Sequence, residues 1–414
     1  MPEAWRRIVS TSGSRLYAAL MGVITLAITA RYLGPEGRGH VATITTWAGL
    51  FAIFGSLSLG QIALHRAVGA SAQKAAWLPS AFRVLLSMTV LVSVAGWLIV
   101  ALLQASTSLF ASLHWSWLLF GFLLLPPMLW EQYGGSLLMA QEQLQIGNRA
   151  MVIGRTLSAL LVIALVAYAA WGVTGAIIAT LLGQWFSSAW ILLHLLGPAR
   201  PLRRPSAAEI GDYVRDGLKL HLNAVGAFLI SGMDVLMVGH FRGPAETGLY
   251  QLSVQLTLML LIVPQAAAMV VYGAVSRSGA RDGWPVHRRL LWQTLLLMVV
   301  VGAIAGVAAP WWLPMLAGVQ FLPAIEIFRW QLLGIVGSTF SIVMAPQWIA
   351  RGYFWQASTL TVAVGVANFV GNLLLIPRFG MHGAVWSSLA CSALAIVGNG
   401  SIAMLCEAES RSTA

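Results

Sequence analysis

Long apolar runs separated by short polar or basic connections make up almost the whole chain. The first run lies between Arg15 and Arg31, the second follows Gly39, and the region from Val84 to Trp130 contains no charged residue. A membrane-spanning helix needs about 20 mostly apolar residues, so this uncharged region must hold two spans. The same reading of the remaining runs predicts an all-α integral membrane protein of about twelve transmembrane helices.

Two glycine motifs occur twice in the chain at almost the same spacing. The sequence GPEGRG begins at Gly34, and GPAETG begins 209 residues later at Gly243. The pattern GxxGA begins at Gly172 and, 208 residues later, again at Gly380. Matches at one spacing indicate an internal duplication, which is common among transporters.

The duplication predicts two pseudo-symmetric six-helix bundles around a central cavity. We expect the first bundle at residues 1–197 and the second at 216–414. Between them, residues 198–215 form a basic linker. An even number of spans in each half gives the two halves the same orientation in the membrane.

Composition excludes a soluble protein. Of the 414 residues, 58% are hydrophobic and only 9% charged, with a mean hydropathy of +0.80, whereas soluble domains carry about a quarter charged residues. The connections are too short for a catalytic domain outside the membrane. The only cysteines, Cys391 and Cys406, lie in the last apolar run, so we expect no disulfide framework or metal site. We also expect no cofactor, and the short connections predict no enzymatic activity.

The charges predict the orientation of the chain. There are 24 Lys and Arg residues against 13 Asp and Glu, a net charge of +11. In the twelve-span arrangement, 19 basic residues fall on one side, 4 fall on the other and Arg329 lies within a span. This bias predicts that both termini and the linker are cytoplasmic. Because the basic residues lie in connections between apolar runs, they indicate membrane topology, and we expect no nucleic-acid partner.

Several motifs together resemble a known family. They are the segment from Arg31 to Gly39, Asp234 shortly before Gly243, the Gly-Leu-Tyr run at Gly248, and the two GxxGA patterns. In these features the chain resembles the polysaccharide-biosynthesis (O-antigen type) flippases of the multidrug/oligosaccharidyl-lipid/polysaccharide exporter superfamily.

The resemblance implies alternating access in a bacterial inner membrane. It implies that an undecaprenyl-pyrophosphate-linked oligosaccharide moves from the cytoplasmic to the periplasmic leaflet for assembly of a surface polysaccharide such as the lipopolysaccharide O-antigen. The expected partners are this lipid-linked substrate, membrane lipids, a polysaccharide polymerase and a chain-length regulator.

Basic residues inside predicted spans are candidates for binding the pyrophosphate, because a charge near the bilayer centre costs about 2.5–3.5 kcal/mol without a wet cavity or a partner. Arg155 lies about two turns inside the fifth predicted helix. If the heads converge, the cationic site comprises Arg155, Arg15, Lys219, His221 and Asn223. Two alternatives remain open. Arg15 and Lys219 could be interfacial anchors, and Arg155 could be a structural partner of Glu131.

The acidic candidates have structural alternatives that we favour. Asp234, in the outer half of the seventh helix, could bind a proton or a coupling cation. A structural role is favoured, in which Asp234 pairs with Arg242 or Arg31 to latch the outer gate or caps the helix end. Glu131 follows two prolines and could serve as a proton or sugar site, although a packed helix kink is favoured.

Other residues are candidates for helix packing, for gating movements or for contacts with sugars. Glu326 and Arg329, three residues apart on one helix face, predict an internal ion pair. Pro264 and Gly55 are related by the repeat spacing and are candidate gating hinges. Trp47, Trp348 and Trp355 could stack on sugar rings, although belt and core roles are favoured for the tryptophans in general.

Two other functions are alternatives to a flippase. A membrane glycosyltransferase or O-antigen ligase would need catalytic side chains on a sizeable outer loop, and the outer connections are short. A cation-coupled multidrug antiporter of the same superfamily would favour acidic residues in its cavity, and the chain has few acids within its spans. An anionic substrate is therefore favoured.

Overall fold

The computed structural model describes residues 3–69, 74–107, 110, 113–199 and 205–411, and these contain helices and turns but no strand. The predicted all-α fold is confirmed. Part of the predicted linker, residues 200–204, lies outside the described residues.

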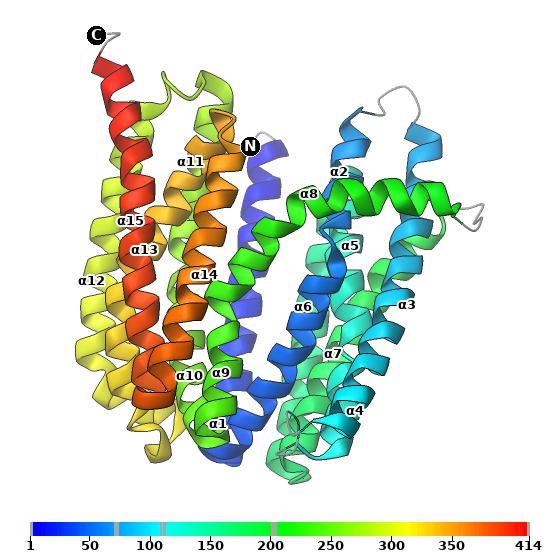
Figure 1. Cartoon of the computed structure of the whole chain (residues 1–414), viewed down its shortest axis with the longest axis vertical. Coiled ribbons are helices and arrows are strands. Elements are labelled where there is room, and N and C mark those ends of the chain that lie inside the picture. Colours follow the sequence, from blue (N-terminus) through cyan, green and yellow to red (C-terminus); the bar gives the residue numbers. More distant parts are fainter. Residues whose placement is uncertain (1–2, 70–73, 108–109, 111–112, 200–204, 412–414) are drawn as a thin grey trace. The chain divides into compact units, whose positions relative to one another are not determined.

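The chain divides into two compact units, Met1–Val225 and Gly226–Ala414 (Figure 1). The first unit contains α1 (Glu3–Ser56), α2 (Leu59–Gly69), α3 (Lys74–Ser106), α4 (Trp115–Phe122), α5 (Leu125–Ala140), α6 (Leu144–Val162), the π-helix η1 (Ile163–Tyr168) and α7 (Gly172–Leu196). Helix α8 (Ala207–Ser231) crosses the boundary. The second unit contains α9 (Met233–Arg242), α10 (Pro244–Leu260), α11 (Ile262–Ser278), α12 (Trp284–Ala317), the 3₁₀-helix η2 (Val319–Phe321), α13 (Ala324–Ala350), α14 (Phe354–Phe379) and α15 (Met381–Arg411).

Helix α8 begins inside the predicted linker and packs on the first unit. Tyr213 is buried in the same hydrophobic cluster as Phe82 of α3 and Tyr133 of α5. The Arg66 guanidinium of α2 lies 4.1 Å from the centre of the Tyr213 ring. Figure 1 shows the first turns of α8 crossing the ends of α2 and α3. Residues 207–215 of the predicted linker thus form a helix packed on the first unit. The division into two bundles at 198–215 stays a prediction.

The GPxxxG motifs form the same backbone turn in both units. Gly34 has φ 67° and ψ −176°, and Gly243 has φ 85° and ψ 179°. Only glycine adopts this region readily, and the proline that follows each one suits the first position of the next helix. The continuous α1 is therefore two helices joined at Gly34.

The GxxGA motifs have matching local structures as well. Gly172 and Gly380 both have positive φ, at 56° and 57°. Three residues later, a Cβ on Gly175 would lie 3.1 Å from the Leu165 carbonyl oxygen, and one on Gly383 would lie 2.5 Å from that of Leu375. In both units the first glycine thus makes the turn and the second lets the new helix approach the backbone of the preceding helix.

The number of spans is nine among the described residues, judged by length and apolarity. It rises to ten if the pair α8–α9, bent by 43°, forms one span. The count treats α1 as one span despite the break at Gly34, and it leaves out α4 and α5, which have 8 and 16 residues. The predicted number of twelve is not confirmed.

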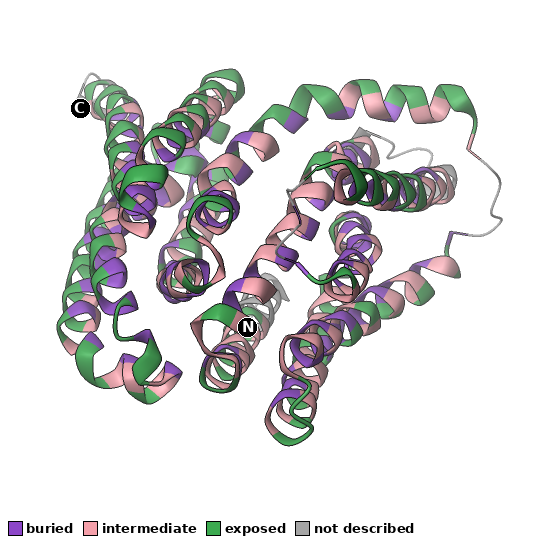
Figure 2. Ribbon diagram, turned by 60° about the horizontal axis from the view of Figure 1, so that its bottom comes forward, coloured by how far each residue is buried: buried purple, intermediate pink, exposed green. Residues whose placement is uncertain are grey.

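Packing inside each unit follows from amphipathic helices. In Figure 2, buried and exposed positions alternate around single helices. The largest cluster of the first unit joins α2, α3, α5, α7 and α8, and a cluster of the second unit joins α11, α12, α13 and α15. Large apolar side chains such as Leu102, Val307 and Val397 are exposed, at 67–72%. An apolar surface of this kind is suited to lipid.

A substitution at Gly243 tests the glycine turn. A Cβ at Gly243 meets no atom within 4 Å, so the cost of Gly243→Ala comes from the backbone conformation alone. We expect a loss of about 1–3 kcal/mol, measured as a lower thermal unfolding midpoint in detergent. Gly211→Ala on an exposed turn of α8, where a Cβ also meets nothing, should stabilise by about 0.5–1 kcal/mol. Equal shifts in the two variants would contradict the assignment.

Candidate functional site

A cavity of about 390 Å³ in the first unit collects three charged side chains from three helices. Arg15 comes from α1, Glu131 from α5 and Arg155 from α6. The polar residues around them are Asn148, Ser158, Thr180, Gln184 and Ser187. This concentration of polar groups between apolar helices is what a hydrophilic head group needs within a membrane.

Two glycines position this cavity. At the crossing of α6 and α7, a Cβ on Gly154 would lie 2.7 Å from the Gly183 carbonyl oxygen, and one on Gly183 would lie 2.6 Å from that of Gly154. Only glycine at both positions allows the backbones to come this close. The next residues in sequence, Arg155 on α6 and Gln184 on α7, both line the cavity. Sequence analysis missed these glycines, because their role depends on which helices cross.

Glu131 is held by side chains of α7. The Gln184 amide nitrogen donates to a Glu131 carboxylate oxygen at 3.3 Å, and Ser187 also hydrogen-bonds the carboxylate. The two prolines before it occupy the start of α5, after the break from α4, and do not kink a continuous helix. The kink favoured from the sequence is therefore a helix boundary.

The Arg155 side chain is exposed to the cavity, as is that of Arg15. Arg155 lies close enough to Glu131 for an electrostatic interaction. In the part of the chain that the structure describes, however, the two form no ion pair within 4 Å. The guanidinium and the carboxylate thus face one cavity as separate groups.

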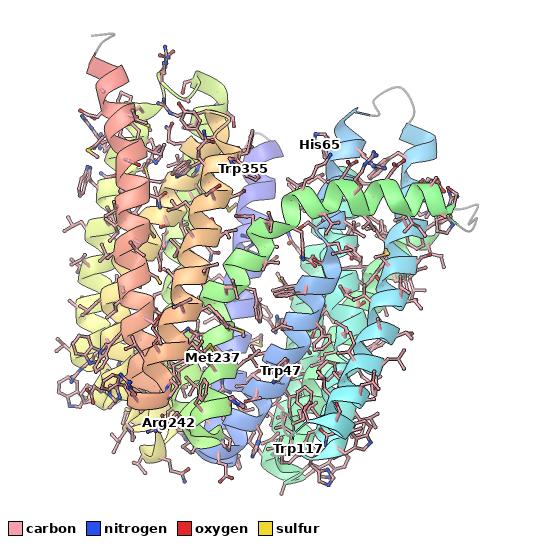
Figure 3. The ribbon with its side chains drawn as sticks, viewed as in Figure 1. Trp47, His65, Trp117, Met237, Arg242 and Trp355 are labelled. Carbon is pink, nitrogen blue, oxygen red and sulfur yellow. The ribbon has the colours of Figure 1, made fainter. Side chains whose placement is uncertain are left out.

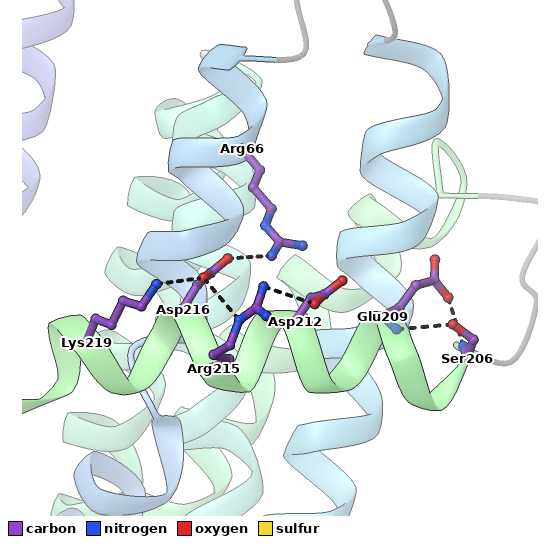
Figure 4. Close-up of polar contacts among 7 residues, drawn as sticks. All are labelled: Arg66, Ser206, Glu209, Asp212, Arg215, Asp216 and Lys219. Carbon is purple, nitrogen blue, oxygen red and sulfur yellow. Dashed lines mark hydrogen bonds and ion pairs between the residues drawn. The ribbon is translucent and has the colours of Figure 1, made fainter.

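The other predicted members of the cationic site do not line this cavity. Lys219 donates to Asp216 at 3.4 Å on the exposed side of α8, as Figure 4 shows. His221 lies against Ser58, with 3.3 Å between its Nδ1 and the serine oxygen, and Asn223 is exposed. The structure brings Arg15 and Arg155 together and leaves these three residues outside.

Lys219 belongs to a charged network that fastens α8 to the first unit (Figure 4). Asp216 accepts from Arg66 of α2 at 2.8 Å, and Glu209 accepts from Ser80 of α3 at 3.0 Å. Ser206 and Glu209 form a capping box, in which each side chain bonds the other residue's backbone N–H. These contacts attach the start of α8 to the ends of α2 and α3.

A second cavity, of about 380 Å³, lies in the second unit and contains Asp234. Its carboxylate accepts hydrogen bonds from the Tyr250 hydroxyl and from the Val235 backbone N–H, the latter at 2.8 Å. Gln331, Asn368 and Ser388 are among the polar residues of its wall. Asp234 is therefore a buried carboxylate beside a largely apolar cavity whose wall carries several hydroxyl and amide groups.

The favoured pairing of Asp234 with Arg242 is wrong. Arg242, at the end of α9 (Figure 3), donates to Glu246 at 3.1 Å. Glu246 also accepts the Met381 backbone N–H at 3.2 Å and so joins the turns that follow Gly243 and Gly380. Arg31 is exposed in the last turn before Gly34, and its pairing with Asp234 stays a prediction.

Comparison with known proteins identifies the family. Residues 4–279 match the family model of polysaccharide biosynthesis proteins. The chain belongs to the polysaccharide biosynthesis protein family. The resemblance inferred from the sequence motifs is therefore confirmed.

A probable low-salt glycan biosynthesis flippase of Haloferax volcanii is a curated relative of this chain. The two are 22% identical over 226 residues, which cover 49% of this chain and 43% of the relative. The match thus spans less than half the length of that relative.

Solved structures share the fold of this polysaccharide biosynthesis protein. The lipid II flippase MurJ in an inward closed conformation has a TM-score of 0.75 at 14% identity, covering 94% of this chain and 86% of that one. An inward-facing multidrug resistance MATE family transporter of the MOP superfamily has a TM-score of 0.71 at 18% identity, covering 96% of both chains. Each likeness, at such low identity, establishes the fold alone.

Both predicted hinge positions in this family member lie next to helix breaks. Helix α1 ends one residue after Gly55, where Leu57 and Ser58 have positive φ of 46° and 53°. Pro264 is the third residue of α11, just after the break between α10 and α11. The Tyr133 hydroxyl donates to the Ser56 carbonyl oxygen at 2.8 Å and so covers the first break. Their gating role stays a prediction.

The tryptophans considered for sugar stacking lie elsewhere. Trp47 packs edge-on against Phe110, with ring centres 5.2 Å apart, in a core cluster of the first unit. Trp348 is buried and donates to Asn399 at 2.8 Å. Trp355 is 71% exposed at the start of α14 (Figure 3).

The predicted ion pair between Glu326 and Arg329 is also wrong. Glu326 lies 3.4 Å from His382, and Arg329 donates instead to the Gly306 carbonyl oxygen of the neighbouring helix. Arg329 thus bonds a carbonyl oxygen of another helix and not the Glu326 carboxylate one turn away.

A packing role for Gly55 can be tested directly. A Cβ at this position would overlap the Val92 side chain of α3. We expect Gly55→Ala to lower the free energy of unfolding by about 1–3 kcal/mol through overpacking, and a second substitution, Val92→Ala, to restore most of it. Thermal unfolding of both variants and of Val92→Ala alone measures this. A double variant no more stable than Gly55→Ala would refute the packing role.

Proposed function

We propose that this protein is a flippase that moves a lipid-linked oligosaccharide across the membrane by alternating access. The observation that carries the proposal is the cavity with two arginines and one carboxylate enclosed by apolar helices. Its guanidiniums suit a pyrophosphate, which offers several acceptor oxygens for forked hydrogen bonds. The family, and the description of the Haloferax relative, support a glycan substrate.

In the proposed mechanism the head group crosses within the protein and the lipid tails stay in the bilayer. Arg155 and Arg15 bind the pyrophosphate, and the polar residues near them bind the first sugars. The resemblance suggests undecaprenyl pyrophosphate as the carrier, and a bacterial inner membrane with cytoplasmic termini as the location. In such a membrane the interior is negative, which favours outward movement of an anion by about 2.3 kcal/mol per charge per 100 mV.

Glu131 has a defined place in this mechanism. An unneutralised carboxylate near the guanidiniums would compete with the pyrophosphate for them, and its bonds to Gln184 and Ser187 hold it on the α7 side. The cavity can therefore keep the charge of Arg155 partly balanced when it is empty and release Arg155 to a stronger anionic ligand.

A polysaccharide polymerase and a chain-length regulator are the partners we propose to act on the oligosaccharide after its release from the flippase.

Asp234 is the candidate coupling group. Its burial beside a cavity with hydroxyl and amide groups in its wall, and with Tyr250 as a neutral donor, suits a site that exchanges a proton or a small cation between states. Coupling of this kind is also compatible with the drug antiporter considered above. The arginines of the first cavity favour the anionic substrate.

Substitution of Arg155 tests the substrate site. Arg155→Ala should lower flipping by about tenfold or more, because water replaces a charge-assisted phosphate contact poorly, and Arg155→Lys should retain partial activity. The measurement is flipping of a fluorescent lipid-linked oligosaccharide in proteoliposomes. Arg149→Ala is the matched control, since Arg149 is exposed on the same helix and outside the cavity.

The charge swap Arg155→Glu with Glu131→Arg separates substrate binding from a structural pair. If Arg155 binds substrate, the double variant stays inactive although it folds and inserts. Restored flipping in the double variant would establish the ion pair and defeat the substrate assignment.

Substitution of Asp234 tests coupling. Asp234→Asn keeps a side-chain acceptor for Tyr250 and removes the titratable charge. We expect folded protein whose flipping no longer responds to an imposed proton or Na⁺ gradient, whereas Asp212→Asn on the exposed part of α8 responds as the wild type does. An unchanged gradient response in Asp234→Asn would eliminate the coupling role.

A further inference from the structure

A groove of about 410 Å³ runs between α12 and α13 in the second unit and shares no lining residue with the cavity around Asp234. Its walls are apolar, with Val299, Gly302 and Val307 on α12 and Leu332 and Val336 on α13. Arg329 is the one charged residue among those that line it. A cation in an otherwise hydrocarbon-like groove requires an explanation.

Pro310 explains part of the position of Arg329. Proline has no N–H, so within α12 it leaves the carbonyl four residues earlier, that of Gly306, without its helical donor. Arg329 Nε donates to this oxygen at 2.9 Å. One turn of α12 is thereby repaired by a side chain of α13, and the guanidinium is fixed at one end of the groove.

The rest of the guanidinium remains available. Its terminal nitrogens form no other hydrogen bond or ion pair with a residue that the structure describes, and the side chain is exposed. Glu326, the nearest acid in sequence, pairs with His382 and does not neutralise it. The positively charged Arg329 guanidinium therefore presents its two terminal nitrogen donors to the groove.

Exposed tryptophans indicate the depth of this end in the membrane. Trp311, next to Pro310, is 68% exposed, and Trp330, next to Arg329, is 38% exposed. Tryptophan concentrates where hydrocarbon meets the head groups. Arg329 is the sixth residue of α13 and lies at this level, where lipid phosphates are within reach of its side chain.

The length of the groove matches a single leaflet. On α12 its lining runs from Met298 to Val307, which corresponds to about 14 Å at a rise of 1.5 Å per residue. Half of a hydrocarbon core of about 30 Å is nearly the same length. Gly302 and Gly306 keep the floor of the groove low, since neither carries a side chain.

We propose that this groove binds one anionic phospholipid. Its phosphate pairs with the terminal nitrogens of Arg329, and one acyl chain lies along the groove between α12 and α13. The inference does not depend on the proposed flippase activity, because it concerns a different unit and different residues.

Lipid titration of the purified protein in detergent, followed by native mass spectrometry, tests the site. We expect the wild type to retain one phosphatidylglycerol in preference to phosphatidylethanolamine. Arg329→Gln should weaken this binding about tenfold, the size of one lost charge-assisted contact. Ala303→Phe should weaken it similarly by filling the groove from an exposed position while the bond between Arg329 and Gly306 stays intact.

A matched control defines specificity. Arg378→Gln removes an exposed arginine of α14 outside the groove. This variant should bind phosphatidylglycerol as the wild type does.

Several results would overturn the proposal. They are equal binding of the two phospholipids, unchanged binding in Ala303→Phe, or tighter binding of undecaprenyl phosphate than of phosphatidylglycerol at Arg329. A protein dimer that dissociates in Ala303→Phe would assign the groove to a second copy of the chain and would overturn it as well.

Discussion

Backbone hydrogen bonding inside a membrane constrains every feature of this protein. Because hydrocarbon offers no partner to a free N–H or C=O group, the chain is helical wherever it is apolar, and each break needs cover from within the protein. The break after α1 is covered by the Tyr133 hydroxyl on the Ser56 carbonyl. The carbonyl that Pro310 leaves open is covered by Arg329. Polar side chains far from any substrate site are therefore explained by the backbone.

Charged side chains also need partners inside the protein, and the basic residues differ in whether they have one. Lys219, at the end of the α8 network, pairs with an acid and has a structural partner. Arg155 and Arg15 face a cavity, and the nearby carboxylate of Glu131 is held by Gln184 at a separation from Arg155 that leaves no direct pair. An incompletely balanced positive cavity costs free energy that an anionic head group can recover. This difference separates the candidate site from Lys219.

Much of this architecture could be predicted from the amino-acid sequence. Apolar runs of sufficient length predict spanning helices, and the spacing of Gly34 and Gly243 predicted equivalent turns, which the backbone angles match. The prediction that Arg15 and Arg155 converge rested only on their entering their helices from the same, cytoplasmic side of the predicted spans. The exact number of spans could not be predicted from the sequence, because α4 and α5 are short and separated by a break whose position depends on packing.

The helical membrane class, the glycine turns and the family follow from the amino-acid sequence, because these depend on local conformation and on apolar length. Which charges meet depends on how the helices pack. Gly154 and Gly183 let α6 and α7 cross closely, so that Arg155 and Gln184 line one cavity, whereas Lys219 of α8 pairs with Asp216 outside it. Glu326 and Arg329 share a helix face yet pair elsewhere, because partners on neighbouring helices were nearer. Helix periodicity specifies a side chain's face, and only the neighbouring helix specifies its partner.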